Sequence, residues 1–265
     1  MIKLLGIPYD KNSSFMGGPA LAPPKLREME SNGSANRFSE MGIEIVRGIN
    51  YADLGDLNCT DDDSETAFNK IMTTTLNHIS EGGKIISIGG DHSIAFPVIA
   101  AHSMQYDELH VLQIDAHADL YDNFGDNPYS HASPFARLLE KGSIASLTQV
   151  GIRTMTKHLQ EQVNRFGVKV VEMKNFNSDF INELRGPLYI SLDLDALDPA
   201  FAPGVSHHEP GGLTSREVMH IIQNIEVEIV GADIVELNPN RDLNDMTAML
   251  AYKLFKEICS KMLTP

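Results

Sequence analysis

The chain has 265 residues, of which 42% are hydrophobic and 22% are charged, and its 36 acidic and 21 basic residues give a formal net charge of -15. This composition is typical of a globular protein, and we expect residues 1–265 to form a single domain. The excess of acidic residues argues against nucleic acid as a partner, because binding to phosphates depends on Lys and Arg. A cationic ligand suits this composition better.

Cysteine content and apolar runs limit the class of protein further. Cys59 and Cys259 are the only cysteines and lie far apart, so neither a disulfide framework nor a cysteine metal cluster is expected. The first ten residues are too short and too interrupted for a signal peptide. No stretch approaches the roughly 18 apolar residues of a membrane helix. We therefore expect a soluble, cytoplasmic protein with no membrane partner.

Short apolar runs alternate along the chain with segments of helical periodicity. Strands are predicted at 2–7, 43–46, 84–88, 109–114, 147–150, 168–171, 188–192 and 229–235. Helices are predicted at 66–79, 158–166, 215–225 and 245–262, and the acidic run at 61–65 marks the start of the first of them. This alternation predicts an α/β fold with a largely parallel sheet, and the continuously apolar strands indicate helices on both faces.

Four of the predicted strands end in polar residues that apolar packing does not explain. These polar segments occupy positions 89–93, 115–119, 193–198 and 236–239. In open parallel sheets ligands bind beyond the carboxyl ends of the strands, so segments far apart in sequence can share one crevice. We expect the chemistry of the protein to be concentrated there.

Three of these segments carry residues that can ligate metal. Taken singly, an Asp after a strand is more often a turn former and a His more often a packing residue. Together, however, four crowded carboxylates would repel one another and raise their own pKa values unless a cation neutralised them. Oxygen donors with a minority of imidazole favour Mn²⁺, with Zn, Fe or Co still open, and six ligands suggest two ions rather than one. The candidates are His92, Asp115, His117, Asp119, Asp193 and Asp195.

Three motifs resemble the signatures of the ureohydrolases, the arginase and agmatinase family. They are Gly-Gly-Asp-His-Ser at 89–93, Asp-Ala-His-Ala-Asp at 115–119 and Ser-Leu-Asp-Leu-Asp-Ala-Leu-Asp-Pro at 191–199. The resemblance covers nearly the whole chain. It implies a three-layer α/β/α fold, two Mn²⁺ per subunit, and hydrolysis of a small cationic guanidino substrate to urea and an amine. It also implies a homo-oligomer, a trimer or a hexamer.

The resemblance also implies a role for each candidate residue. One manganese would be held by His92, Asp115, Asp119 and Asp193, and the other by Asp115, His117, Asp193 and Asp195. Asp119 would also orient the attacking water, Glu236 would pair with the guanidinium group, and His131 would give a proton to the departing amine. The simpler alternatives are an ordinary strand-end acid at Glu236 and a solvated loop histidine at His131.

Two segments of the sequence favour different substrates. Residues 203–212 resemble plant-type arginases and favour conversion of L-arginine to L-ornithine and urea. Residues 121–130 have agmatinase character, which keeps agmatine open and, more distantly, guanidinobutyrate and formiminoglutamate. Within the second segment, Asn123, Asn127 and Ser130 could donate hydrogen bonds to the carboxylate of arginine.

Two functions of other classes are also considered. A deacetylase on a related fold would use one zinc ion and fewer acidic ligands. A catalytically silent binding relative would usually have lost a ligand. The complete set of acidic residues argues against both.

Overall fold

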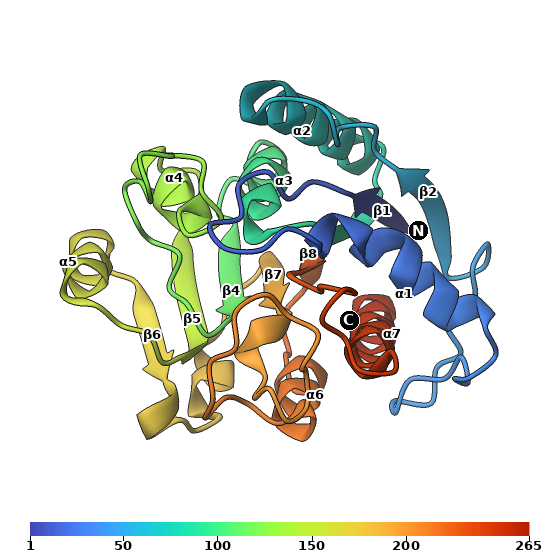
Figure 1. Cartoon of the computed structure of the whole chain (residues 1–265). Coiled ribbons are helices and arrows are strands. Elements are labelled where there is room, and N and C mark those ends of the chain that lie inside the picture. The colour runs from blue at the N-terminus through green and yellow to red at the C-terminus, as the bar shows by residue number, and fades with distance from the viewer. Residues whose placement is uncertain (265) are drawn as a thin grey trace.

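All eight strands within residues 1–264 lie in one sheet, and every pairing between neighbouring strands is parallel. The computed structural model describes residues 1–264 (Figure 1). The order of strands across the sheet is β2-β1-β3-β8-β7-β4-β5-β6. The strands are β1 (Ile2–Ile7), β2 (Tyr51–Asp56), β3 (Lys84–Gly89), β4 (His110–Ile114), β5 (Ser146–Ile152), β6 (Lys169–Glu172), β7 (Leu188–Asp193) and β8 (Ile229–Val235).

Helices cover both faces of this sheet (Figure 1). One face packs against α1 (Ala22–Ser31), α6 (Ser215–Gln223) and α7 (Met246–Leu263). The other face packs against α2 (Ser64–Ser80), α3 (Ala95–Ser103), α4 (Pro134–Glu140) and α5 (Lys157–Phe166). Each face therefore has its own apolar core, which explains why the central strands are apolar on both sides. The predicted three-layer α/β/α fold is confirmed.

The four strands whose ends carry the polar segments are consecutive neighbours in the middle of the sheet. Ile88 of β3 lies opposite Ile234 of β8, which also lies opposite Leu192 of β7. Leu192 in turn lies opposite Ile114 of β4. Because the strands are parallel and in register here, their carboxyl ends reach the same edge of the sheet together.

Side chains at the helix ends explain where two of the helices begin. Asp63 accepts a hydrogen bond from the backbone N of Thr66 at 2.8 Å and caps α2, which confirms the acidic run as a helix start. Thr214 and Glu217 form a reciprocal capping box at the start of α6. Such caps satisfy amide groups that would otherwise lack a partner at the helix start.

One predicted strand was wrong, and one strand and three helices were missed. Residues 43–46 form no strand and take part only in an isolated bridge between Phe38 and Glu44. The strand beside β1 at this edge of the sheet is β2 instead, whose polar sequence Tyr-Ala-Asp-Leu-Gly-Asp shows no apolar run because most of its residues are only partly buried. Helices α1, α3 and α4 were not predicted. Each has a proline among its first three residues, which reads as a turn in the sequence.

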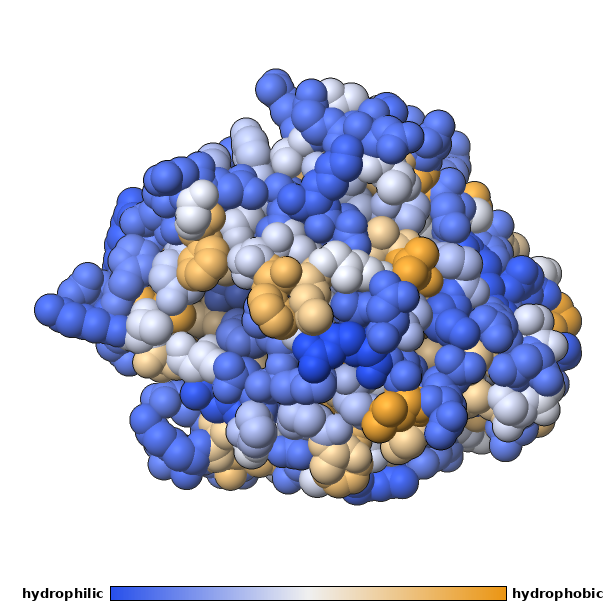
Figure 2. All heavy atoms as spheres, viewed as in Figure 1, coloured by the Kyte–Doolittle hydropathy of each residue, from blue (hydrophilic) through white to orange (hydrophobic). Residues whose placement is uncertain are grey.

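The surface is mostly polar on the face shown. Figure 2 shows that the face in view is mostly hydrophilic, with hydrophobic side chains in small separate groups. Within residues 1–264, every helix lacks the length or the apolar character that a bilayer-spanning helix needs.

Candidate active site

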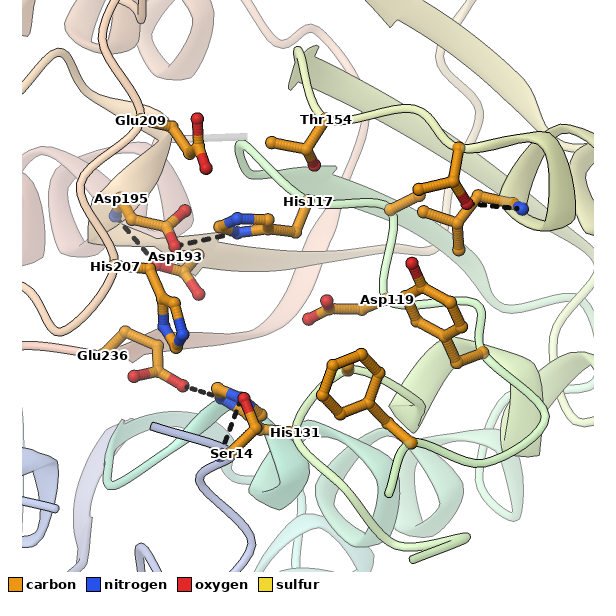
Figure 3. A pocket seen from close by; sticks show the side chains of 16 residues that line it. Ser14, His117, Asp119, His131, Thr154, Asp193, Asp195, His207, Glu209 and Glu236 are labelled. Atoms are coloured by element: carbon orange, nitrogen blue, oxygen red, sulfur yellow. Dashed lines mark hydrogen bonds and ion pairs between the residues drawn. The ribbon is translucent and has the colours of Figure 1, made fainter. Parts of the chain in front are cut away.

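A cavity of about 270 Å³ opens at the carboxyl ends of the central strands and is lined by sixteen residues (Figure 3). This volume lies near the lower end for ligand sites, so the cavity suits a substrate of amino-acid size. Six of the residues predicted from the sequence line it: His117, Asp119, His131, Asp193, Asp195 and Glu236. His92 and Asp115 are fully buried beside them.

The first group of candidate ligands surrounds the Nδ1 atom of His92. This nitrogen lies 3.0 Å from Asp115 Oδ2, 3.1 Å from Asp119 Oδ2 and 3.2 Å from Asp193 Oδ2. It is buried and has no hydrogen-bond partner within residues 1–264. The other ring nitrogen, Nε2, lies 2.9 Å from Ser191 Oγ, which orients the ring. Four donor atoms from the ends of β3, β4 and β7 thus converge on one point.

The second group adjoins the first and shares Asp115 with it. His117 Nδ1 lies 3.0 Å from Asp195 Oδ2 and 3.7 Å from Asp115 Oδ1. The backbone N of His117 donates to Asp115 Oδ1 at 2.7 Å, and the backbone N of Ala116 donates to Asp195 Oδ1 at 3.2 Å. These amides hold the two carboxylates in place. One carboxylate that faces both groups is the arrangement that two bridged metal ions require.

The charges of this cluster are poorly balanced without an added cation. Burial and the carboxylates of Asp195 and Asp115 raise the pKa of Asp193 well above its ordinary value. Burial together with Asp115 raises the pKa of Asp119 to about 6. Burial opposes a charge on His92, but its three carboxylate neighbours outweigh that effect and raise its pKa. In the absence of metal, bound protons therefore neutralise part of the negative charge of this cluster. Divalent cations can bind in place of those protons.

Backbone conformation aims two of the carboxylates into the cavity. Asp119 has φ 49° and Glu236 has φ 64°, both in the left-handed region that residues other than glycine rarely adopt. Such a conformation costs on the order of 1–3 kcal/mol and persists only where the surroundings enforce it. Strained residues of this kind are typical of functional sites.

Glu236 and His131 form a buried pair. Glu236 Oε1 accepts a hydrogen bond from the backbone N of His92 at 2.9 Å and lies 2.8 Å from His131 Nδ1, whereas Oε2 is buried without a partner within residues 1–264. Burial opposes a charge on His131, but Glu236 outweighs it and raises the pKa of His131 to about 9. His131 Nε2 contacts Ser14, whose Oγ lies at 2.8 Å and whose backbone N lies at 3.1 Å. The Ser14 hydroxyl can accept from the charged ring or donate to the neutral one, whereas the Ser14 backbone N–H can only donate, to Nε2 when that nitrogen carries no proton.

The three residues predicted to bind the substrate carboxylate do not line the cavity. Asn123 is exposed, Asn127 donates to Asn12 Oδ1 at 3.0 Å, and Ser130 is buried. Their role in binding stays a prediction. The same segment contributes two other residues to the cavity wall, Tyr121 and Phe124.

Several lining residues were missed at the sequence level. The ring centroid of His207 lies 5.8 Å from that of His117 and 5.4 Å from that of His131. Glu209 and Thr154 also line the cavity (Figure 3). Thr154 follows the carboxyl end of β5, so its place after a strand is the signal that could have identified it. His207 and Glu209 belong to residues 203–212, which were interpreted only as a sign of similarity to plant-type arginases.

Comparisons with known proteins agree with this geometry. The sequence model described as "Arginase family" matches residues 1–260. The chain belongs to the arginase family. It is 44% identical to "Arginase 1, mitochondrial" of Arabidopsis thaliana, over 98% of this chain and 80% of that protein. It is 36% identical to "N(1)-aminopropylagmatine ureohydrolase" of Thermus thermophilus, over 93% of this chain and 86% of that protein.

A solved structure extends the similarity to the fold. "Arginase from Medicago truncatula" superposes with a TM-score of 0.92 and 40% identity, over 98% of this chain and 87% of that one. The predicted resemblance to ureohydrolases is confirmed, and the chain is a ureohydrolase. The predicted cytoplasmic location is contradicted, because plant relatives are named mitochondrial or chloroplastic/mitochondrial.

Proposed function

We propose that this ureohydrolase converts L-arginine to L-ornithine and urea with two Mn²⁺ per subunit. The observation that carries the proposal is the pair of ligand groups that share Asp115, beside a cavity into which Glu236 presents a buried and unpartnered oxygen. Agmatine, which would yield putrescine and urea, is the second candidate.

The donor set fits two divalent ions. His92, Asp115, Asp119 and Asp193 would hold one ion, and Asp115, His117, Asp193 and Asp195 the other. Four carboxylates and two imidazoles without a thiolate suit a hard ion such as Mn²⁺. When bound, two such ions lower the pKa of a shared water and so supply the nucleophile for attack on the guanidinium carbon.

Glu236 provides the binding partner for the guanidinium group. Its Oε1 is already engaged by the backbone N of His92 and by His131, which fixes the side chain. Its Oε2 is free to accept an N–H of the substrate, and a carboxylate matches the planar fork of a guanidinium. Burial of this pair strengthens the attraction, because the local dielectric is low.

Two further residues handle protons. Asp119 lines the cavity next to the metal ligands and can accept a hydrogen bond from the attacking water. His131 carries a proton at neutral pH, since its pKa is raised to about 9, and can give it to the departing amine. The contact with Ser14 holds the imidazole at the edge of the cavity while this proton moves.

The preference for arginine rests on the sequence of residues 203–212 and on the plant relatives, which are named arginases. The Thermus thermophilus relative, named for an agmatine derivative, supports agmatine as the second candidate. The agmatinase character of residues 121–130 also supports it.

A parallel urea-release assay tests the proposal. Purified protein loaded with Mn²⁺ would be given arginine, agmatine, guanidinobutyrate and formiminoglutamate, and its metal content measured. We expect two ions per subunit and the highest kcat/KM with arginine. A higher value with agmatine would replace arginine as the substrate, and metal-loaded protein that releases urea from none of the four would contradict the proposal.

A further inference from the structure

The segment that carries His131 contacts the N-terminal loop at two points. The backbone N of His131 donates to the backbone O of Asn12 at 3.1 Å, and His131 Nε2 lies 2.8 Å from Ser14 Oγ. In Figure 3, Ser14 and His131 lie together beside Glu236. Neither Ser14 nor His131 belongs to a helix or strand. The position of His131 therefore depends on the contacts that hold the N-terminal loop.

The side chain of Asn12 holds this loop through three hydrogen bonds. Asn12 is only 4% exposed. Its Oδ1 accepts from Ser64 Oγ at 2.9 Å and from Asn127 Nδ2 at 3.0 Å, which uses both lone pairs of that oxygen. Its Nδ2 donates to Ser93 Oγ at 3.1 Å. The amide thus joins the N-terminal loop to the start of α2, to the segment that carries His131 and to the turn after β3.

The contacts of Asn12 reach both sides of the first candidate metal ligand, His92. The backbone N of Asn12 donates to Asp91 Oδ2 at 2.9 Å. Ser93 Oγ, which accepts from the Asn12 amide, donates its own proton to Asp91 Oδ1. Asp91 and Ser93 are the two neighbours of His92 in the sequence. Asn12 therefore connects His131 to the turn that bears this ligand.

Asn12 can affect the reaction only through the position of other residues. It is not among the sixteen residues that line the cavity, and it belongs to neither candidate ligand group. Its amide carries no charge, so it adds no electrostatic field of its own to the site. A catalytic group that is misplaced by about 1 Å can lower a rate by roughly 10²-fold, so a contact that sets the position of His131 is important for turnover.

We propose that Asn12 is a positioning residue for His131 and that its buried amide fixes the imidazole relative to the metal-ligand turn after β3. This inference rests on the proposed function, in which His131 gives a proton to the departing amine. Asn127, which the sequence suggested as a ligand of the substrate carboxylate, acts in this arrangement through its hydrogen bond to Asn12.

The test is a double-mutant cycle between Asn12→Ala and His131→Ala, with the guanidino compound that gives the highest kcat/KM in the urea-release assay. In the enzyme that keeps His131, we expect Asn12→Ala to lower kcat about 10- to 100-fold, with KM within about twofold and both metal ions retained. In the His131→Ala background the same replacement should change kcat by at most about twofold, because no imidazole is left to position. A merely structural role would lower kcat in both backgrounds.

A second pair of variants serves as the test if Asn12→Ala does not fold. Asn127→Ala and Ser64→Ala each remove one hydrogen bond to the same oxygen of Asn12, but only Asn127 lies in the segment that carries His131. We expect Asn127→Ala to lower kcat about 3- to 10-fold, the equivalent of one neutral hydrogen bond, and only where His131 is present. Ser64→Ala is the matched control and should keep kcat within about twofold.

The outcomes separate this inference from the proposed function. An unaltered, metal-loaded enzyme that releases no urea from any guanidino compound, or a His131→Ala variant with unchanged kcat, would overturn the proposed function or its proton donor. In an active enzyme that depends on His131, the positioning role alone would be overturned by any of three results. These are unchanged kcat in Asn12→Ala, an equal loss of kcat with and without His131, or a loss in Ser64→Ala as large as that in Asn127→Ala.

Discussion

Asp193 has contacts with both groups of candidate ligands. Its Oδ2 lies 3.2 Å from His92 Nδ1, and its Oδ1 accepts from the backbone N of Asp195 at 2.8 Å. Replacement Asp193→Ala removes the bridging carboxylate and leaves the remaining acids without a matched cation. Since loss of an outer-shell partner already costs about 10- to 100-fold in metal affinity, we expect a larger loss here and no measurable urea release. Metal content after dialysis and the urea assay check this.

The control for this variant is Asp107→Ala, because Asp107 is exposed and does not line the cavity. It should keep both metal content and activity. Full metal content with near-normal activity in Asp193→Ala would show that the ligand assignment is wrong.

His131 should act on turnover rather than on metal binding. Neither ring nitrogen of His131 belongs to either candidate ligand group, and its partners are Glu236 and Ser14. We expect His131→Ala to keep both ions and to lower kcat by about 10²- to 10⁴-fold, the range for a positioned acid or base. The kcat of the unaltered enzyme should also decline above the pH of about 9 at which His131 loses its proton. Metal loss in His131→Ala would instead make His131 a ligand.

At the scale of secondary structure, the site depends on sharp turns directly after the central strands. The turn after β3 passes close to the end of β1, where a Cβ on Gly90 would lie 1.8 Å from the backbone O of Tyr9. A residue with a side chain therefore fits at position 90 only if the backbone moves. The position of His92, two residues later, therefore depends on a glycine at position 90.

We expect Gly90→Ala to destabilise the fold by about 1–3 kcal/mol, the usual cost of overpacking, and to weaken metal binding by displacing His92. Gly17→Ala is the comparison, since a Cβ there meets its nearest atom at 3.6 Å and the backbone is not left-handed. Urea denaturation and metal content measure both effects. Equal stability of the two variants would contradict the argument from close approach.

At the scale of the whole molecule, the crowded charges should link stability to metal and pH. Burial opposes the charged form of His92, His117 and His131, but neighbouring carboxylates outweigh it and raise all three pKa values. Above about pH 6.5 an unfolded histidine loses its proton while these folded ones keep theirs, so the free energy of unfolding of the metal-free protein should fall from about pH 6.5 to 8.5.

Bound Mn²⁺ should reverse much of that loss. Metal binding stabilises the folded state by mass action and displaces protons, so it strengthens as pH rises. The increase in Tm between chelator-treated and Mn²⁺-loaded protein should therefore be larger at pH 8.5 than at pH 6.5. Thermal unfolding at the two pH values measures it, and an equal or smaller increase at pH 8.5 would contradict the proposed charge balance.

The sequence by itself determined the α/β class and most of the sheet, because seven of its strands are apolar runs that helices cover on both faces. It also pointed to His92, Asp115, His117, Asp119, Asp193 and Asp195, since acids and imidazoles grouped at strand ends have few structural explanations. It failed at β2, where partial exposure at the sheet edge removes the apolar pattern, and at 43–46, where an apolar run forms no strand.

Only the tertiary structure decided which of these residues share a site. The order β3-β8-β7-β4 brings His92 within hydrogen-bond reach of Glu236, 144 positions further along the chain. It also placed Glu209 and Thr154 in the cavity and left Asn123, Asn127 and Ser130 outside its lining. Local sequence determines the periodicity of strands and helices and the residues of turns. Contacts between residues on opposite sides of the cavity depend instead on the order of the strands and on loops that groups such as Arg153 hold in place.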